Sequence, residues 1–224
     1  MKAKTVLITA GPTREALDPV RFISNHSTGK MGYAIAHQFL ENGYQVILVS
    51  GPVTVQIPPD PMLTVINVES AMQMLAACKR YFKSVDGCVF TAAVADYRPG
   101  KVANEKIKKK GEEMTIILVK NPDIAAYFGK LKSDTQFSVG FALETNDEMT
   151  HALQKIESKN LDLVVLNSMN DKNATFGYDT NKVSIIKRNG EVHLFPLKDK
   201  KEVAADIVAM IENVFTEKEM IKGL

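Results

Sequence analysis

Short apolar runs alternate with longer amphipathic segments along the chain, and this alternation predicts strands that alternate with helices. The apolar runs are rich in β-branched residues and are continuous, which is typical of strands covered on both faces. The predicted strands are residues 5–10, 45–50, 64–68, 88–92, 115–119, 138–142 and 161–167. The pattern therefore predicts an α/β fold: a doubly wound, mostly parallel Rossmann-like sheet with helices on both faces.

The amphipathic segments between the strands are the predicted helices. They are residues 32–41, 70–81, 122–131, 147–158 and 200–215. Ser70 is predicted to cap the second helix, with Met72, Leu75 and Ala76 facing the core. Asn121 is predicted to cap the third helix, which carries a proline in its first turn.

The C-terminal part of the chain breaks the alternation. Residues 183–187 and 192–195 flank Arg188-Asn189-Gly190, a turn sequence that predicts a β-hairpin and so an antiparallel edge to the sheet. The polar residues after 216 are expected to form a frayed tail. Residues 93–113 are irregular and charged, and are expected to form a long mobile loop. No linker divides the chain, so one domain is predicted over residues 1–224.

Composition excludes several classes of protein. Hydrophobic residues make up 45% and charged residues 24%, which excludes a disordered chain, a collagen-like chain and a small disulfide scaffold. The net charge is +2, from 28 basic and 26 acidic residues, so a dedicated nucleic-acid binder is not expected. The longest apolar runs are far shorter than the roughly 20 residues of a membrane span, and residues 6–10 are too short for a signal peptide. We therefore expect no membrane partner and a cytoplasmic location.

The cysteines and histidines give no pattern of metal ligands. Cys78 and Cys88 are the only cysteines and lack CxxC spacing, so they are expected to be reduced and buried. The four histidines are scattered along the chain. We therefore expect no metal site built from protein side chains.

Glycines and polar residues follow the predicted strands, at the sheet edge where ligands of parallel sheets bind. In residues 24–32, glycines and the hydroxyls of Ser27 and Thr28 lead directly into a helix start, with Lys30 beside them. This segment is either an anion cradle or a plain loop with a helix cap. It is not a Walker A loop, and the chain lacks GxGxxG.

Other candidate residues each allow two interpretations from the residues alone. Lys106 begins a lysine-rich run that is either solvated surface or a mobile cation closing over a polyphosphate. Asp96 follows a strand and either binds a base, ribose or metal, or caps a turn. Lys155 and Lys159 share a helix face, which surface lysines often do by chance.

Asn25 and His26 also lie in the 24–32 segment. They either position a substrate or form a turn, which is the commoner use of an isolated loop asparagine.

Taken together, several segments resemble phosphopantothenoylcysteine synthetase, the phosphopantothenate–cysteine ligase of coenzyme A biosynthesis. The resemblance extends from about residue 4 to residue 215, with the motifs in the family's order. The segments that carry it are GPTRE (11–15), DPVRFISNHSTGKMG (18–32), AAVADY (92–97), KIKK (106–109), KNPDI (120–124) and GFALETN (140–146).

The resemblance implies that the chain joins 4′-phosphopantothenate to L-cysteine through an acyl-nucleotide intermediate, with release of pyrophosphate and a nucleoside monophosphate. Bacterial members use CTP and eukaryotic relatives favour ATP, so CTP is expected here. Mg²⁺ or Mn²⁺ is expected on the triphosphate. Family members pair as homodimers, with elements of one subunit near the other's site.

The resemblance also implies roles for individual residues. Lys106 would neutralise the phosphates, Asn25 would bind the acyl nucleotide, and Arg21 would lie on the substrate side with His26. Phe141 would border the base. The implied nucleotide-binding positions are Ser27, Gly29, Phe90, Thr91, Ala92, Asp96, Lys106, Pro122, Asp123, Ile124, Ala125, Phe141, Lys155 and Lys159.

One departure from the family and two alternatives complete the prediction. Many bacterial members carry a flavin-dependent decarboxylase half before the synthetase; here the first predicted strand begins at residue 5, so we expect ligation without decarboxylation and no flavin. An NAD(P)-dependent oxidoreductase is disfavoured because the glycine fingerprint is missing. A non-catalytic nucleotide sensor is disfavoured because Lys106 and Asn25 are both present.

Overall fold

The computed structural model describes residues 3–109, 111–144, 146–168 and 178–222. Its centre is an eight-stranded sheet in the order β13-β12-β10-β9-β6-β1-β4-β5. The six strands from β10 to β5 are parallel, and β12 and β13 are antiparallel to them. Their bounds are β1 Thr5–Ala10, β4 Gln45–Ser50, β5 Leu63–Asn67, β6 Gly87–Phe90, β9 Phe137–Glu144, β10 Leu163–Ser168, β12 Ser184–Lys187 and β13 Val192–Leu194. The predicted fold class and the C-terminal hairpin are confirmed.

The order of the strands places a crevice beside β1. From β1 the chain continues outward to β4 and β5 on one side, whereas β6, β9 and β10 extend the sheet on the other side. The connections therefore leave the carboxyl ends of β1 and β6 in opposite directions. Open α/β sheets bind ligands at such a switch point.

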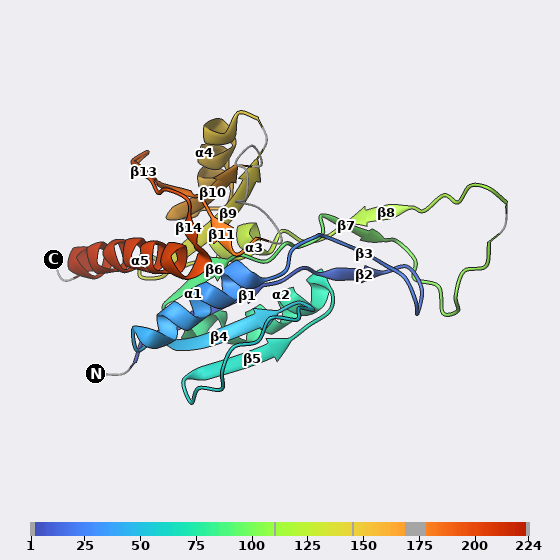
Figure 1. Cartoon of the computed structure of the whole chain (residues 1–224), viewed down its shortest axis with the longest axis horizontal. Coiled ribbons are helices and arrows are strands. Elements are labelled where there is room, and N and C mark those ends of the chain that lie inside the picture. Colours follow the sequence, from blue (N-terminus) through green and yellow to red (C-terminus); the bar gives the residue numbers. More distant parts are fainter. Residues whose placement is uncertain (1–2, 110, 145, 169–177, 223–224) are drawn as a thin grey trace.

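Helices cover both faces of the sheet (Figure 1). Helices α1 (Lys30–Glu41) and α5 (Lys200–Lys222) pack against one face, in a core with Val6, Ile8 and Ala10 of β1. Helices α2 (Ala71–Tyr81), α3 (Ile124–Gly129) and α4 (Glu148–Ser158), with the short 3₁₀ helix η1 (Phe82–Ser84), lie on the other face, whose core includes Leu7. Every residue of β1 is buried, which explains why its sequence is mostly apolar and does not alternate with exposed polar residues.

Four short strands form an arm that projects from the body (Figure 1). Strand β2 (Arg14–Ala16) pairs with β3 (Phe22–Ser24), and β7 (Tyr97–Pro99) pairs with β8 (Leu118–Lys120), both antiparallel. The prediction that residues 93–113 form one loop is therefore wrong, because residues 97–99 form strand β7. This strand pairs with β8, about 20 residues later in the chain, and such pairing leaves no local pattern in the sequence. The strand predicted at 115–119 is the shorter, shifted β8. A further two-residue pair joins β11 (Thr180–Asn181) to β14 (Lys198–Asp199).

Two predictions about helix α2 and helix α3 need correction. Met72 is 48% exposed and Ala76 is also exposed, because Met74, Leu75 and Cys78 form the buried face of α2. Ser70 does cap α2, in a capping box with Gln73.

The cap of α3 is Asp123, whose carboxylate accepts a 2.9 Å hydrogen bond from the N–H of Ala126. Asn121, the predicted cap, is buried instead, and its amide donates to the carbonyl of Ala95 at 2.8 Å. Asn121 therefore ties the loop before α3 to the segment that follows β6.

Helix α5 continues beyond its predicted end at residue 215 to Lys222. Its last turns are tied to the body by ion pairs, Lys218 to Asp162 at 2.9 Å and Glu219 to Lys4 at 2.8 Å. The helix therefore does not end at residue 215, and residues 216–222, which were predicted to fray, are helical.

None of the helices in the described part of the chain combines the length and the apolar character needed to cross a membrane.

Candidate active site

The segments that follow β1 and β6 are joined along the crevice. The N–H of Ala93 donates to the carbonyl of Gly11 at 2.9 Å, and the N–H of Thr13 donates to the carbonyl of Ala93 at 3.3 Å. The fully buried hydroxyl of Thr13 accepts a 3.0 Å hydrogen bond from the N–H of Ala95. These bonds extend the parallel pairing beyond the strand ends, so the crevice has a fixed backbone floor.

Asn25 lies on this floor. Its side-chain amide donates to the carbonyl of Ala93 at 3.0 Å, and the hydroxyl of the preceding Ser24 donates to the carbonyl of Thr13 at 2.8 Å. Asn25 is itself exposed, so the rest of its amide is accessible from solvent.

The start of helix α1 is open to an anion. Its N-cap is Gly29, with φ 76°, a left-handed conformation that favours glycine. No side chain of the described residues caps the helix, and its first turn has no acidic residue. The unpaired N–H groups and the positive end of the helix dipole therefore favour a negatively charged group.

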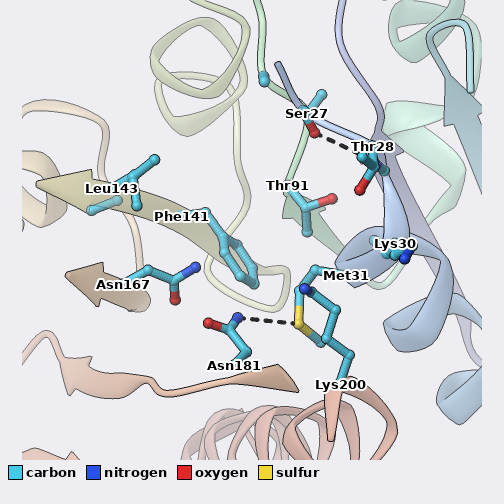
Figure 2. Close-up of a pocket in the computed structure, with 15 residues that line it drawn as sticks. Ser27, Thr28, Lys30, Met31, Thr91, Phe141, Leu143, Asn167, Asn181 and Lys200 are labelled. Atoms are coloured by element: carbon cyan, nitrogen blue, oxygen red, sulfur yellow. Dashed lines mark hydrogen bonds between the residues drawn. The ribbon is translucent and has the colours of Figure 1, made fainter. Parts of the chain in front are cut away.

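A small cavity of about 190 Å³, here called the α1 pocket, lies at this helix start (Figure 2). It contains five of the predicted nucleotide-binding residues: Ser27, Gly29, Thr91, Ala92 and Phe141. The complete lining is Ser27, Thr28, Gly29, Lys30, Met31, Gly32, Thr91, Ala92, Ala93, Phe141, Ala142, Leu143, Asn167, Asn181 and Lys200.

A larger cavity of about 500 Å³, here called the α3–α4 pocket, lies on the other side of the ends of β6 and β9. It brings together most of the other predicted nucleotide-binding residues: Phe90, Asp96, Pro122, Asp123, Ile124, Ala125, Lys155 and Lys159. Ala92, Ala93 and Phe141 line both pockets. The carbonyl of Ala93, to which Asn25 is bonded, therefore lies at the boundary between the two pockets.

The α3–α4 pocket carries cationic groups. The ammonium of Lys159 lies 2.9 Å from the carboxylate of Asp123, and Lys155 lines the same pocket one helical turn earlier. Burial alone would raise the pKa of Asp123, but the N–H of Ala126 and the ammonium of Lys159 hold that pKa below its usual value. Asp123 is thus an anion near neutral pH and fixes the position of Lys159.

Four predicted residues lie outside the lining of both pockets: Asn25, Lys106, Arg21 and His26. Lys106 and His26 are exposed. Arg21 forms an ion pair with Asp18, with 2.5 Å between Nη2 and Oδ2. Its guanidinium also donates to the carbonyl of Ile107 at 2.9 Å.

Asp18 fastens the lysine-rich segment to the arm. Its side chain is fully buried, and it accepts hydrogen bonds from Arg21 and from the N–H groups of Val20 and Ile107. The hydrogen bond from Arg21, followed by those from the backbone, keeps the pKa of Asp18 well below its usual range. Since Arg21 holds the carbonyl of Ile107, both polar groups of that residue's backbone are bound, directly beside Lys106.

Sequence reasoning missed three residues of the α1 pocket: Asn167, Asn181 and Lys200. Asn167 ends a predicted strand, so the rule that ligands lie at strand ends was a sufficient signal for it. Asn181 and Lys200 come from the small β11–β14 pair and the start of α5, and nothing local in the sequence brings them to the site.

Lys200 is held without an acidic partner in the described part of the chain. Its ammonium donates to the backbone carbonyls of Tyr178 and Thr180, the latter at 3.2 Å. Burial and the nearby charge of Lys30 lower its pKa, while Asp179 acts in the opposite direction. Asp179 pairs with Lys30 instead, at 2.6 Å.

Carboxylates suited to a metal ion are few at this edge of the sheet. Within the described ranges, no three His, Cys, Asp or Glu side chains gather in a way that could hold an ion. The α3–α4 pocket contains the carboxylates of Asp96 and Asp123. The carboxylate of Asp123 already pairs with the ammonium of Lys159 and accepts a hydrogen bond from the N–H of Ala126. This donor set suits an Mg²⁺ ion held chiefly by phosphate oxygens, with at most Asp96 added.

Comparison with known proteins gives consistent results. The family model described as "DNA/pantothenate metabolism flavoprotein C-terminal domain" matches residues 1–215. The "Coenzyme A biosynthesis bifunctional protein CoaBC" of Vibrio vulnificus (strain YJ016) is 43% identical over 216 residues, 96% of this chain and 53% of that protein. A "Cysteine/Cysteine sulfinic acid decarboxylase" from an unknown prokaryotic organism is 47% identical over 211 residues, 94% of this chain and 58% of that protein.

A crystal structure of the C-terminal domain of a coenzyme A biosynthesis bifunctional protein CoaBC superposes with a TM-score of 0.81 and 40% identity, over 97% of this chain and 98% of that chain. The chain thus spans about half the length of the curated relatives that it matches, but nearly all of this solved domain.

Proposed function

The chain belongs to the family of the DNA/pantothenate metabolism flavoprotein C-terminal domain, the phosphopantothenoylcysteine synthetase family, and on that premise we propose that it joins 4′-phosphopantothenate to L-cysteine with consumption of a nucleoside triphosphate. One observation supports this most: the Asn25 amide is bonded to the Ala93 carbonyl at the boundary between the α1 pocket and the α3–α4 pocket. A ligase needs such a boundary, because the activated acyl group must lie between a nucleotide and an incoming amine.

In the first step, a carboxylate oxygen of phosphopantothenate attacks the α-phosphorus of the nucleotide. A P–O bond forms, the bond to the β-phosphate breaks, and pyrophosphate leaves. Both reactants are anions, so the site must neutralise charge and align the attack. Lys155 and Lys159 of the α3–α4 pocket, the N-terminus of α1 and Lys106 supply the positive charge in this proposal.

In the second step, the cysteine amine attacks the acyl carbon. A C–N bond forms, the C–O bond to the nucleotide breaks, and the nucleoside monophosphate leaves with the electron pair while the amine releases its proton to water. Asn25 acts here as a hydrogen-bond donor that orients the acyl nucleotide. Because an amide is neutral, it can approach the phosphate without repulsion.

Mg²⁺ or Mn²⁺, bound to the triphosphate oxygens, would neutralise charge on the leaving pyrophosphate. The protein's share is Asp96, the carboxylate of the α3–α4 pocket that is not paired with Lys159. CTP is the proposed nucleotide, with ATP the alternative, and Phe141 borders the base.

We also propose a homodimer. The arm exposes apolar side chains, among them Phe22, Tyr97 and Ile117, the last 78% exposed, and a second copy would cover them. Lys106 lies on the same arm, outside the pockets of its own chain, so a paired arm would bring it near a partner's site.

The proposal concerns the reaction of this chain alone. The longer relatives named above include one called a decarboxylase, and that name belongs to the whole of that protein. Ligation without decarboxylation or flavin, and a cytoplasmic location, remain predictions. An oxidoreductase and a nucleotide sensor remain the alternatives.

Pyrophosphate release tests the proposal. We expect it to require a nucleotide and phosphopantothenate, and the amide product to require cysteine in addition, with CTP more effective than ATP. Hydride transfer to or from a nicotinamide would support the oxidoreductase, and nucleotide binding without turnover would support the sensor.

A further inference from the structure

A buried carboxylate lies at the base of the arm, in the segment GPTRE (11–15), to which the resemblance assigns no role. Glu15 is the middle residue of β2 and is only 2% exposed. Its Oε1 accepts a 2.9 Å hydrogen bond from the N–H of Ala71, the first residue of α2. Burying a carboxylate destabilises a protein unless the group is paired, so its presence here indicates that the contact with α2 has a use.

The start of α2 is suited to receive this carboxylate. Its first turn has no acidic residue of its own, and the positive end of the helix dipole favours an anion. Ser70 accepts from the N–H of Gln73 at 3.3 Å, and the Gln73 side chain accepts from the N–H groups of Glu69 and Ser70. The N–H of Ala71 has no acceptor within the helix, and Glu15 supplies one. The arm therefore completes the cap of this helix.

A chain of contacts leads from the start of α2 to Asn25. The N–H of Arg14 donates to the carbonyl of Glu69 at 2.7 Å, so two successive residues of β2 are bonded to the start of α2. Strand β2 pairs with β3, where Arg14 lies opposite Ser24, and Asn25 follows directly. The side chain of Asn25 reaches the Ala93 carbonyl across 3.0 Å. The backbone of Asn25 is thus placed by β3, β3 by β2, and β2 by α2.

The turn between β2 and β3, at the far end of this hairpin, is held by different groups. Asp18 and Arg21 bond the backbone of Ile107 there. Those bonds do not involve Glu15. Loss of the Glu15 contact should therefore displace the end of the hairpin that leads into Asn25, while the lysine-rich segment keeps its anchor.

We propose that Glu15 is a positioning residue for Asn25 and acts through its hydrogen bond to the start of α2. The inference rests on the proposed function and adds to it a residue outside both the α1 pocket and the α3–α4 pocket. When the bond is lost, the Asn25 amide shifts relative to the Ala93 carbonyl, and the acyl nucleotide is poorly oriented for the cysteine amine. The second step is impaired more than the first, in which the supply of positive charge dominates.

Two variants break the contact from its opposite sides. Glu15→Met keeps the length of the side chain and removes the acceptor. Ala71→Pro removes the donor at the first position of a helix, where proline is favoured. The preceding Ser70 is extended, with φ −104° and ψ 163°, as a residue before proline requires.

Two further variants serve as rescue and control. Glu15→Gln retains a side-chain oxygen that can accept from the N–H of Ala71. Ser70→Ala removes a different cap from the same end of α2 and leaves the contact with the arm in place. The second variant therefore separates the stability of the helix from the position of the arm.

The measurement is the ratio of acyl nucleotide to amide product in quenched reactions with phosphopantothenate, CTP and cysteine. We expect Glu15→Met and Ala71→Pro to raise this ratio about 10-fold, because misplacing a reacting group slows its step by that much or more. Pyrophosphate release without cysteine should stay within about threefold of the wild type, since it reports the first step alone. Glu15→Gln should resemble the wild type, and Ser70→Ala should lower the midpoint of urea unfolding without raising the ratio.

Three results would overturn the positioning role. An unchanged ratio in Glu15→Met or in Ala71→Pro would show that the contact does not act on Asn25, and either folded variant is sufficient for this. An equal rise in Ser70→Ala would assign Glu15 to the stability of α2. An equal loss in both steps would show that Glu15 holds the arm as a whole. Failure of the proposed function is distinct, because the wild-type protein would then form no acyl nucleotide.

Discussion

The N–H of Ile107 donates a hydrogen bond of 3.0 Å to the carboxylate of Asp18, which lies 89 residues earlier in the chain. Arg21 completes the contact by donating to the carbonyl of Ile107. The backbone beside Lys106 is therefore fixed by a buried carboxylate and its guanidinium partner. This arrangement makes Asp18 a positioning residue for Lys106, although Asp18 itself lies outside both pockets.

Replacing Asp18 with Asn should slow the first half-reaction about 10-fold or more. Oδ2 of Asp18 accepts from the Arg21 guanidinium and the N–H of Ile107, and Oδ1 accepts from the N–H groups of Val20 and Arg21. An amide must turn its NH2 group toward one of these two sets of donors, so the segment that carries Lys106 is held less firmly. The measurement is single-turnover pyrophosphate release, with CTP binding measured separately by calorimetry and expected to be unchanged. Glu112→Gln, an exposed carboxylate on the same arm, is the control.

A double variant shows whether Asp18 acts through Lys106. In the Lys106→Gln background, adding Asp18→Asn should lower the rate of pyrophosphate release only slightly further, because the effects of residues that act as one unit are not additive. If the fold-decrease in the double variant equals the product of the two single fold-decreases, the two residues act independently.

The stability of the protein should depend on pH through Asp18. Its pKa is lowered in the folded protein, so its contribution is present above the pKa of the unfolded chain, about 3.9, and is lost as pH falls toward the folded value. The free energy of unfolding should therefore decrease below about pH 4. Urea unfolding at pH 7 and pH 3 should show a smaller decrease for Asp18→Asn than for the wild type; equal decreases would show that Asp18 is not the source.

The sequence pattern predicted the central sheet well, and physical reasons explain where it failed. Strands β1 and β4 occur at their predicted bounds because nearly all of their residues are buried and most of them are apolar. Strands β2, β3 and β7 were missed and β8 was predicted with shifted bounds, since all four are short, partly exposed, and defined by antiparallel pairing outside the central sheet.

The same distinction holds for the site. Residues in contiguous motifs, such as Pro122 to Ala125, were predicted from the resemblance and come together with Lys155 and Lys159 in one pocket. Asn181 and Lys200 reach the α1 pocket through tertiary packing alone. The spacing of Asp18 three residues before Arg21 is a signal in the sequence for their ion pair. The hydrogen bond from Ile107 to Asp18, in contrast, depends on the fold of the arm.

Lys106→Gln should lower the first half-reaction about 100-fold, because positive charge near the transferred phosphate is lost while the side chain stays polar. Lys108→Gln removes an exposed charge from the same run and should have a small effect. The rate of pyrophosphate release at saturating CTP is the measurement. Equal effects of the two substitutions would show that Lys106 has no specific role and contributes only to the overall positive charge of the lysine-rich run.

Asn25→Asp should block the second step more than the first. The amide that donates to the carbonyl of Ala93 becomes a carboxylate, which repels both that carbonyl and the phosphate of the acyl nucleotide. Mass spectrometry of quenched reactions should show the acyl nucleotide accumulating relative to product. Normal product formation in this variant would remove Asn25 from the reaction centre.

The acyl-nucleotide intermediate is the central claim, and oxygen-18 in the carboxylate of phosphopantothenate tests it most directly. If that carboxylate attacks the α-phosphorus and its oxygen later leaves with the nucleotide, the CMP isolated after one turnover with cysteine must carry one labelled oxygen in its phosphate. Unlabelled CMP, formed at the same rate as the amide product, would contradict the account.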